Sequence, residues 1–258
     1  MKKTYKREVK AGLDRTNQMK PGIITENDLR HLPPPVRKYL EYAGVVGKEK
    51  VLNVRMKFTG RIRSKPEASW MTFASEQYNF FDKPTRIFYI KAFKMGIPVL
   101  GIHLYKDAKA IMVVKLAGLF KVVDAKGREM DQGETVTVFN DMCCMAPASL
   151  IDKGIQWETI DPLTVKARYT NGNITIGATL IFNEQGELVN FVSHDRFEIA
   201  DGKIYKNYPW STPIKEYKVF NGIRTAAVAS TIYHRPDVDF CYGEFILQEI
   251  EYNCRELK

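Results

Sequence analysis

Residues 51–258 repeat one pattern, in which short runs of alternating apolar and polar residues are separated by turn signals at a spacing of roughly ten residues. In residues 54–62, apolar side chains alternate with mostly basic ones, which predicts an antiparallel strand with one exposed face. Dipeptides such as Asn171-Gly172 are typical of the tight turn of a hairpin. About a dozen strands at this spacing predict a mainly β, α+β fold built on a large curved antiparallel sheet or half-open barrel.

One segment, residues 132–146, interrupts the strand pattern with apolar residues at three-to-four spacing. Asp131 and Glu134 stand three positions apart, which is the spacing of a capping box with Asp131 as the cap. Pro147 ends the segment, because the residue before a proline is pushed out of the helical region. We therefore expect an internal helix whose single apolar face is buried against the surrounding sheet.

A second helical region, residues 24–46, precedes the strands. Thr25 and Asp28 have a capping spacing, and Pro35 is well placed as the first residue of a following helix that Gly44 ends. We expect these two short helices to form a clasp on the sheet. The side chains expected to be buried beneath this clasp are Val36, Tyr39 and Leu40.

The first 23 residues are dominated by positive charge. Residues 1–20 carry seven basic and two acidic side chains, a local charge of +5 in a chain of net charge +9. Because few sizeable apolar groups, such as Tyr5 and Val9, stand among these charges, we expect residues 1–23 to be a flexible basic arm. Residues 24–258 would form a single domain. The alternative role for the arm is peripheral contact with an anionic membrane.

The chain has no motif that indicates a metal, nucleotide or nucleophile site. The histidines share no spacing that would place two on one helix or strand face, so we expect no metal site and no cofactor. Cys143 and Cys144 lack the sequence surroundings of a cysteine nucleophile and are expected to be buried, inert thiols. The four histidines are His31, His103, His194 and His234.

The cysteines and the N-terminal sequence indicate the cellular compartment in which we expect the protein. Four cysteines without a disulfide-like arrangement are expected to be free thiols of a reducing compartment. The longest nearly uncharged stretch, residues 95–105, is too short and too rich in Gly and Pro to span a bilayer. Without a basic-then-apolar secretory signal at its start, the chain as written is expected to be cytoplasmic.

A row of basic residues on the first predicted strand, called the basic stripe, raises the question whether the protein binds nucleic acid. Arg55, Lys57, Arg61 and Arg63 alternate with apolar residues and would lie on one outward face. The stripe lacks the interleaved aromatic side chains of a single-strand binder. We expect it to be a solvated face that keeps the sheet soluble, and we expect no nucleic acid as partner.

The composition is rich in aromatic and sulfur-containing residues, with 14 Phe, 13 Tyr and 9 Met. A curved sheet of this size has more inner surface than one helix covers, so we expect a cavity between sheet and helix. The alternative for each of these side chains is a place in a filled core. The candidate cavity residues are Trp70, Phe73, Tyr78, Phe88, Met112, Phe120, Phe139, Met142 and Met145.

A polar rim beside this cavity would offer the residues for an enzyme. It would consist of Asp131, Gln132, Glu134 and Trp210. The two carboxylates could act as acid and base, but helix capping accounts for both without catalysis. We therefore assign no catalytic residue.

Several segments resemble a known but uncharacterised bacterial family, a domain of unknown function without an assigned activity. They are residues 32–47 (LPPPVRKYLEYAGVVG), 70–78 with the pattern W-x-x-F-x-x-x-Q-Y, 122–134 (VVDAKGREMDQGE), 157–158 and 208–212 (YPWST). More distantly, the layout of strands around a central helix is similar to the lipoprotein-localisation carriers (LolA/LolB-like). That resemblance implies a half-open barrel that holds acyl chains against an internal helical lid. Such carriers have a secretion signal or a lipidated cysteine, and the chain as written has neither.

These observations favour a non-enzymatic protein that binds a lipid or another apolar ligand in a cavity between sheet and helix. One alternative is an enzyme of unknown reaction that uses the polar rim near Asp131 and Glu134. The other is a structural or partner-binding protein with a filled core. The sequence alone predicts neither the ligand nor the oligomeric state.

Overall fold

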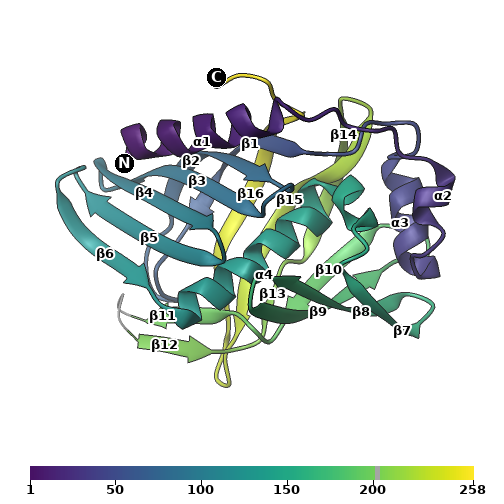
Figure 1. The fold of residues 1–258 in the computed structure, drawn as a ribbon. Coiled ribbons are helices and arrows are strands. Elements are labelled where there is room, and N and C mark those ends of the chain that lie inside the picture. Colours follow the sequence, from purple (N-terminus) through teal and green to yellow (C-terminus); the bar gives the residue numbers. More distant parts are fainter. Residues whose placement is uncertain (201–203) are drawn as a thin grey trace.

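The computed structural model describes residues 1–200 and 204–258, and its largest element is a 14-stranded antiparallel sheet that curves around one long helix (Figure 1). The spatial order of the strands is β6-β5-β4-β3-β2-β1-β16-β15-β13-β10-β9-β8-β7, with β14 paired to β15. Their bounds are β1 (Asn53–Ile62), β2 (Met71–Phe80), β3 (Thr85–Lys94), β4 (Ile97–Lys106), β5 (Lys109–Leu116), β6 (Phe120–Lys126), β7 (Gln156–Asp161), β8 (Thr164–Asn171), β9 (Ile174–Phe182), β10 (Leu188–Ser193), β13 (Trp210–Ser211), β14 (Ile214–Phe220), β15 (Ile223–His234) and β16 (Asp239–Tyr252).

The sheet is an open half-barrel, because β6 and β7 are its two end strands in the part of the chain that the structure describes. A separate two-stranded sheet pairs β11 (Phe197–Ala200) with β12 (Ile204–Asn207). The predicted fold class, a mainly β protein with a large curved sheet around a central helix and helices at the N-terminus, is confirmed. Across the described residues, no helix combines the length and the hydropathy needed to cross a bilayer.

The long helix, α4 (Arg128–Met145), lies within the curve of the sheet, and the face of the sheet that it contacts is called the inner face below (Figure 1). It begins earlier than the predicted residue 132, so Asp131 lies in its first turn and is not its cap. The Asp131 carboxylate instead accepts hydrogen bonds from the Ala110 backbone N–H at 2.7 Å and from Lys109 Nζ at 2.8 Å. The capping expectation is therefore wrong, because β5 supplies the partners of this carboxylate.

Helix α4 is buried on all sides rather than on one face. The four consecutive residues 136–139 are all buried, and four residues complete more than one turn of a helix. The sheet covers most of the helix, and the short 3-10 helix η1 (Pro147–Ile151) packs against it. The chain therefore has a filled core around α4, and an amphipathic pattern is not needed there.

The predicted clasp consists of α2 (Glu26–Leu29) and α3 (Pro34–Ala43), which lie at the end of the half-barrel away from the N-terminus (Figure 1). The Asp28 carboxylate accepts a hydrogen bond from the Thr25 backbone N–H at 2.9 Å, so this capping box is confirmed. The helix α3 begins at Pro34, one residue before the predicted start, and ends at Gly44, whose φ of 73° suits glycine. The three side chains expected beneath the clasp, Val36, Tyr39 and Leu40, are all buried in the main core.

The expected flexible arm at the N-terminus is instead a helix, α1 (Lys2–Thr16), packed on the outer face of the sheet, opposite to α4 (Figure 1). Tyr5, Val9 and Leu13 lie four residues apart, so they form one apolar stripe on this helix. All three are buried in a second core cluster with side chains of β2 and β3. The prediction of an arm was wrong, because it weighed the charge of the segment and overlooked this stripe.

The basic stripe of β1 is largely neutralised by acidic neighbours. Arg55 is buried and pairs with Glu76 at 2.6 Å and with Glu249 at 3.2 Å. Arg61 pairs with Glu244 at 2.6 Å across the neighbouring strand β16. These cross-strand pairs account for the alternation of basic residues in this strand through contacts within the chain.

Candidate functional site

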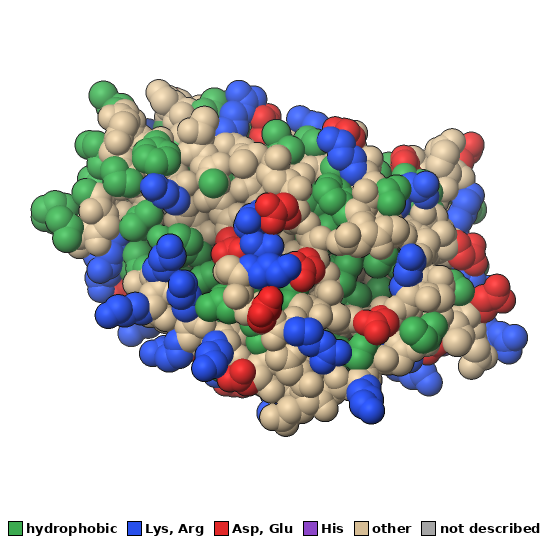
Figure 2. Space-filling view, turned by 90° about the horizontal axis from the view of Figure 1, so that it is seen from above, with side chains coloured by type: hydrophobic (Ala, Val, Ile, Leu, Met, Phe, Trp, Pro, Cys, Tyr) green, Lys and Arg blue, Asp and Glu red, His purple; other side chains and the backbone are tan. Residues whose placement is uncertain are grey.

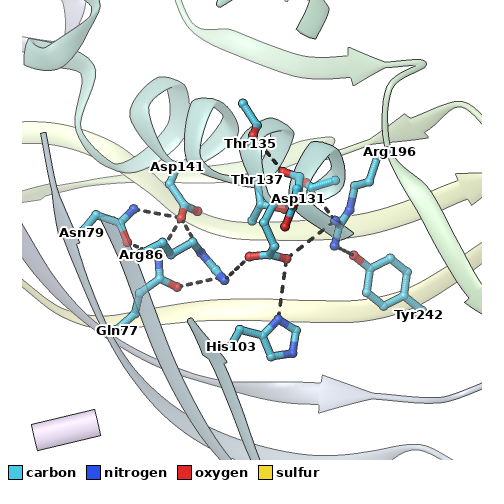
Figure 3. Close-up of polar contacts among 12 residues, drawn as sticks. Gln77, Asn79, Arg86, His103, Asp131, Thr135, Thr137, Asp141, Arg196 and Tyr242 are labelled. Atoms are coloured by element: carbon cyan, nitrogen blue, oxygen red, sulfur yellow. Dashed lines mark hydrogen bonds and ion pairs between the residues drawn. The ribbon is translucent and has the colours of Figure 1, made fainter. Parts of the chain in front are cut away.

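A cluster of buried charges joins α4 to the inner face of β2 and β3 (Figure 3). Arg86 of β3 is its centre. Its guanidinium donates to Glu134 Oε2 at 3.0 Å, to Asp141 Oδ2 at 2.9 Å and to Gln77 Oε1 at 3.0 Å. The same Asp141 oxygen accepts from Gln77 Nε2 at 2.6 Å and from Asn79 Nδ2 at 2.9 Å. Two turns of α4 are thus fixed to two neighbouring strands by charge-assisted hydrogen bonds.

Glu134 is the most enclosed carboxylate of this cluster, and three cationic or imidazole groups surround it. Besides Arg86, His103 Nδ1 lies 3.6 Å and Arg196 Nη1 lies 4.0 Å from Glu134 Oε1. Burial raises the pKa of Glu134, but the charge of Arg86 and the contact with His103 outweigh burial and lower the pKa to about 2. The carboxylate is therefore ionised at neutral pH and is a weak base there.

Arg196 connects the cluster to the aromatic residues of the inner face. Its guanidinium lies 4.7 Å over the Trp210 ring and donates to the Tyr242 hydroxyl at 3.5 Å. Trp210 Nε1 donates to the same hydroxyl at 3.1 Å. Within the described residues, the buried Nε of Arg196 has no hydrogen-bond partner.

The predicted polar rim is only partly one site. Glu134 and Trp210 both contact Arg196, so the structure brings these two together. Gln132 instead donates to Asp195 Oδ1 at 3.3 Å, and Asp131 pairs with Lys109 of β5. Since Asp131 and Glu134 each already accept hydrogen bonds or ion pairs from fixed donors, the geometry supports a structural role for these carboxylates.

Beside the charged cluster, the inner face of β3 to β6 carries a continuous set of apolar side chains that α4 leaves partly uncovered. The register places Val99 beside Leu116, and Leu116 beside Phe120. One step further along the strands, Val114 lies beside Val123. We call this set the apolar strip. Its members are Phe88, Ile90, Val99, Met112, Val114, Leu116, Phe120 and Val123.

The apolar strip is unusual for an inner face because most of its side chains keep partial contact with solvent. Phe88 is buried, Phe120 is 68% exposed, and the remaining members lie between these extremes. Phe88 is also next to the charged cluster, since its ring is 5.6 Å from the His103 ring and 4.9 Å from the Arg86 guanidinium. The strip therefore leads from the buried charges to the open end of the half-barrel.

The nine candidate cavity residues separate into groups. Phe88, Met112 and Phe120 belong to the apolar strip, and Phe73 lies on the same inner face in β2. Tyr78 lies on the outer face, where its ring is 6.4 Å from the ring of Tyr5 in α1.

The other four candidates lie elsewhere. Phe139, Met142 and Met145 are on α4, inside the main core. Phe139 is stacked on the Tyr169 ring at 5.1 Å, as in a filled interior. Trp70 lies between the guanidinium groups of Arg61 and Arg63 at the end of β1 and β2.

Two hollows elsewhere on the surface have polar character. One of 840 Å³ is lined by residues such as Arg55, Asn221 and Glu251, and another of 500 Å³ lies beside α2 and α3. None of the nine candidate cavity residues lines either hollow.

The histidines and cysteines are dispersed over the described chain, which holds no group of three His, Cys, Asp or Glu side chains placed for a metal ion. His234 bridges Asp239 at 2.7 Å and Ser211 at 2.8 Å. All four cysteines lie in the described ranges and are free thiols. Burial raises the pKa of Cys144 to about 12, which makes this thiol unreactive at neutral pH.

The residues at the centre of the charged cluster were not identified as site candidates from the sequence. Arg86, Arg196 and Tyr242 come from segments far apart in the chain, and no local spacing connects them. One available signal was Arg86 itself, a charge at the start of a strand that is apolar on both faces. A charge in such a strand needs a buried partner.

The fold and the inner face define a class of protein, a half-open antiparallel barrel around a helix. Similar structures include a LolA superfamily protein from Nitrosomonas europaea (8% identity, TM-score 0.48, 86% of this chain and 94% of that chain). Another is a DUF1329 family protein from Desulfovibrio piger, with 10% identity and a TM-score of 0.46 over 84% of this chain and 91% of that chain. A third is a domain from Vibrio parahaemolyticus named for outer membrane lipoprotein sorting, with 8% identity and a TM-score of 0.41 over 78% of this chain and 85% of that chain.

The sequence comparison identifies the family of this chain, which the fold alone does not. The chain belongs to DUF6544, a family of unknown function, whose model matches residues 22–245. The comparison with curated proteins found no match. The predicted membership in an uncharacterised family and the predicted structural similarity to LolA-like proteins are both confirmed.

Proposed function

We propose that this protein binds a lipid or another ligand with an acyl chain along the apolar strip, without catalysing a reaction on it. The observation that carries the proposal is the partial exposure of the strip on the inner face, where a folded chain would ordinarily bury it. A half-exposed row of aliphatic and methionine side chains suits a flexible apolar ligand, because methionine adapts to varied shapes.

The dimensions of the strip match one acyl chain. Along β5, the distance from Met112 to Leu116 is roughly 13 Å at the rise of an extended strand. The hydrocarbon core of a bilayer is about 30 Å thick, so each leaflet contributes an acyl layer of about 15 Å. The strip is therefore about as long as one acyl layer, which suits a chain lying parallel to the strands.

The surroundings of the strip favour a ligand that lies on the exposed side chains next to α4, rather than one between α4 and the sheet. Phe139 and Met142 on α4 are almost fully buried, so the space between α4 and the sheet is already filled. The filled half of the sheet around β9 and β15 adjoins the uncovered strip, because α4 also contacts β4, β5 and β6. The clasp covers the filled half, which leaves the end at β3 to β6 for entry of the ligand (Figure 1).

Two adjacent valines of β5 provide a matched test. Val114 lies in the apolar strip, whereas Val113 points to the outer face, and both are half-buried. We expect Val114→Asn to weaken uptake of a fluorescent fatty-acid probe by about tenfold or more, since an unpaired polar group in an apolar contact costs roughly 1–3 kcal/mol. Val113→Asn should leave uptake near that of the wild type.

Both variants are compared at equal folded fraction, which urea unfolding measures. Equal loss of uptake in the two variants would overturn the proposal, because it would show a general effect on folding. Absence of uptake by the wild type, together with no lipid in native mass spectra of the purified protein, would also overturn it.

A further inference from the structure

Two neighbouring hairpin turns carry the most exposed large apolar side chains of the described residues. Met95 in the β3–β4 turn is 94% exposed, and Leu119 and Phe120 at the β5–β6 turn are 75% and 68% exposed. The turns lie side by side, since the Ala117 backbone N–H donates to the Pro98 carbonyl at 2.8 Å. Figure 2 shows hydrophobic side chains gathered at this end of the molecule. We call this surface the apolar tip, and it consists of Phe93, Met95, Ile97, Leu119, Phe120 and Val122.

The conformation of the first turn makes an apolar side chain there unexpected. Met95 and Gly96 form a two-residue turn with φ of 50° and 79° between the paired residues Lys94 and Ile97. Such turns favour asparagine followed by glycine, as at Asn221 with φ of 53° in the β14–β15 turn. Methionine in this position is strained and gains no burial. Its side chain therefore adds nothing to the folded chain alone, which indicates a contact outside it.

The tip is flanked by lysines of the sheet. Residues 85–123 hold seven basic side chains and one acidic side chain, Asp107. Three of the basic residues, Arg86, Lys106 and Lys109, lie at the other end of these strands and pair with acidic side chains, so the remaining four lie nearer the tip. Lys115 and Lys121 face each other directly across β5 and β6, although like charges in such a pair are destabilising. Lys121 also pairs with Asp124 at 2.5 Å. The lysines of the sheet nearer the tip are Lys91, Lys94, Lys115 and Lys121.

Helix α1 adds positive charge at the same end. Its first turns lie beside the tip-facing part of β3, where the rings of Tyr5 and Tyr89 are 5.7 Å apart, and the N-terminus lies next to the β3 to β6 turns (Figure 1). Lys2, Lys3 and Lys6 are exposed on this helix. The apolar tip is thus flanked by lysines from the sheet and from α1.

We propose that the apolar tip docks the protein onto an anionic lipid bilayer. Met95, Leu119 and Phe120 enter the headgroup region, and the flanking lysines lie against phosphate and carboxylate groups of the lipids. The shape favours a bilayer over a protein partner, because the apolar side chains project from two narrow turns rather than from a flat face. The inner face opens at this end, since Phe120 belongs to both the tip and the apolar strip. Docking there would place the strip next to the membrane.

The test is sedimentation with vesicles of phosphatidylcholine alone and of phosphatidylcholine mixed with phosphatidylglycerol. We expect the wild type to bind the mixed vesicles and to be released by salt. Met95→Ser combined with Leu119→Ser should weaken this binding by about tenfold, because the apolar contact is lost. Val219→Ser combined with Val238→Ser is the matched control, since both valines are exposed elsewhere on the surface.

Charge is tested in the same way. Lys94→Glu combined with Lys115→Glu should abolish binding to the mixed vesicles, whereas Lys153→Glu combined with Lys206→Glu, an equal change in net charge far from the tip, should reduce it only slightly. All variants change exposed or half-exposed side chains, and their thermal unfolding is measured in parallel.

Three outcomes would overturn the proposal. One is no binding of the wild type to the mixed vesicles, and another is binding that the two tip variants do not alter. The third is concentration-dependent self-association in light scattering that the Met95 and Leu119 substitutions remove, which would identify a second copy of the chain as the occupant. The vesicle assay does not depend on uptake of the fatty-acid probe, so it separates this proposal from the proposed function.

Discussion

At the scale of single residues, Glu134 and Arg86 decide how α4 is held within the sheet. Both side chains are buried, so each depends on the other and on Asp141 and Arg196 for polar partners. The spacing of Glu134 from Asp131 predicted a helix-capping role for Glu134. Its actual partners come from β3 and from the segment before β11, and they change its role from a local cap to a long-range anchor.

Substitution of Glu134 by glutamine should destabilise the protein strongly. Glu134→Gln leaves the buried guanidinium groups of Arg86 and Arg196 without this anion, and we expect a loss of roughly 3–5 kcal/mol in the free energy of unfolding. Urea unfolding at neutral pH measures the loss. Glu158→Gln is the control, because Glu158 is exposed and has no comparable partner role. Equal stability of the two variants would contradict the anchoring role.

The same carboxylate predicts a dependence of stability on pH. The pKa of Glu134 is lowered from 4.5 to about 2 in the folded protein, so its contribution is fully present above pH 4.5 and is lost as the pH falls towards 2. Wild-type unfolding midpoints should therefore decrease over this range. The Glu134→Gln variant should show a shallower decrease, and an unchanged slope would argue against the assignment.

At the scale of elements, α1 shows most clearly how an apolar stripe outweighs charge. The helix carries eight charged side chains, all exposed or half-buried, yet its three stripe residues pack on the outer face of β2 and β3 together with Tyr78 and Ile87. Removing the helix would expose those rings and aliphatic side chains to water. This element therefore belongs to the folded unit.

A pair of alanine substitutions tests the packing of α1. Leu13→Ala removes a side chain that is 2% exposed, and we expect a loss of roughly 2–5 kcal/mol in unfolding free energy. Lys10→Ala changes an exposed position of the same helix and should have almost no effect. Similar small effects of both substitutions would show that α1 does not pack as described.

At the scale of the whole molecule, the filled half and the partly uncovered half of the sheet differ in their exposure to solvent. Around α4 and the clasp, the core is closed on every side, and Cys143 and Cys144 lie within it. At β3 to β6, apolar side chains meet solvent both along the strip and at the tip. Under the proposed function, one sheet would supply stability at one end and a binding surface at the other.

Thiol labelling reports on the closed half. Burial raises the pKa of Cys144 and of Cys254 to about 12, and Cys143 is shifted in the same direction, whereas Cys241 is only half-buried. At pH 8 we expect one thiol of the native protein to react rapidly and all four to react in denaturant without reductant. Two or fewer reactive thiols in denaturant would indicate a disulfide and contradict this description.

Local patterns determined the repeated elements of this protein. Alternation in residues 54–62, the Asn171-Gly172 turn and the Thr25–Asp28 capping box each depend on interactions within a few residues, so the sequence alone predicted the strands, the hairpins and the clasp. An internal helix near residues 132–146 was predicted for the same reason, although the start of that helix was not.

Only the tertiary structure decided which face of each strand is covered and by what. Tyr78 and Phe73 lie in the same strand, but α1 covers one of them and the inner face holds the other, because successive side chains point to opposite faces. The meeting of Arg86, Glu134 and Arg196 likewise depends on the pairing of distant strands. The alternation of apolar residues and the residue preferences of turns act over short distances, whereas burial and charge pairing arise from contacts that form once the sheet has curved around α4.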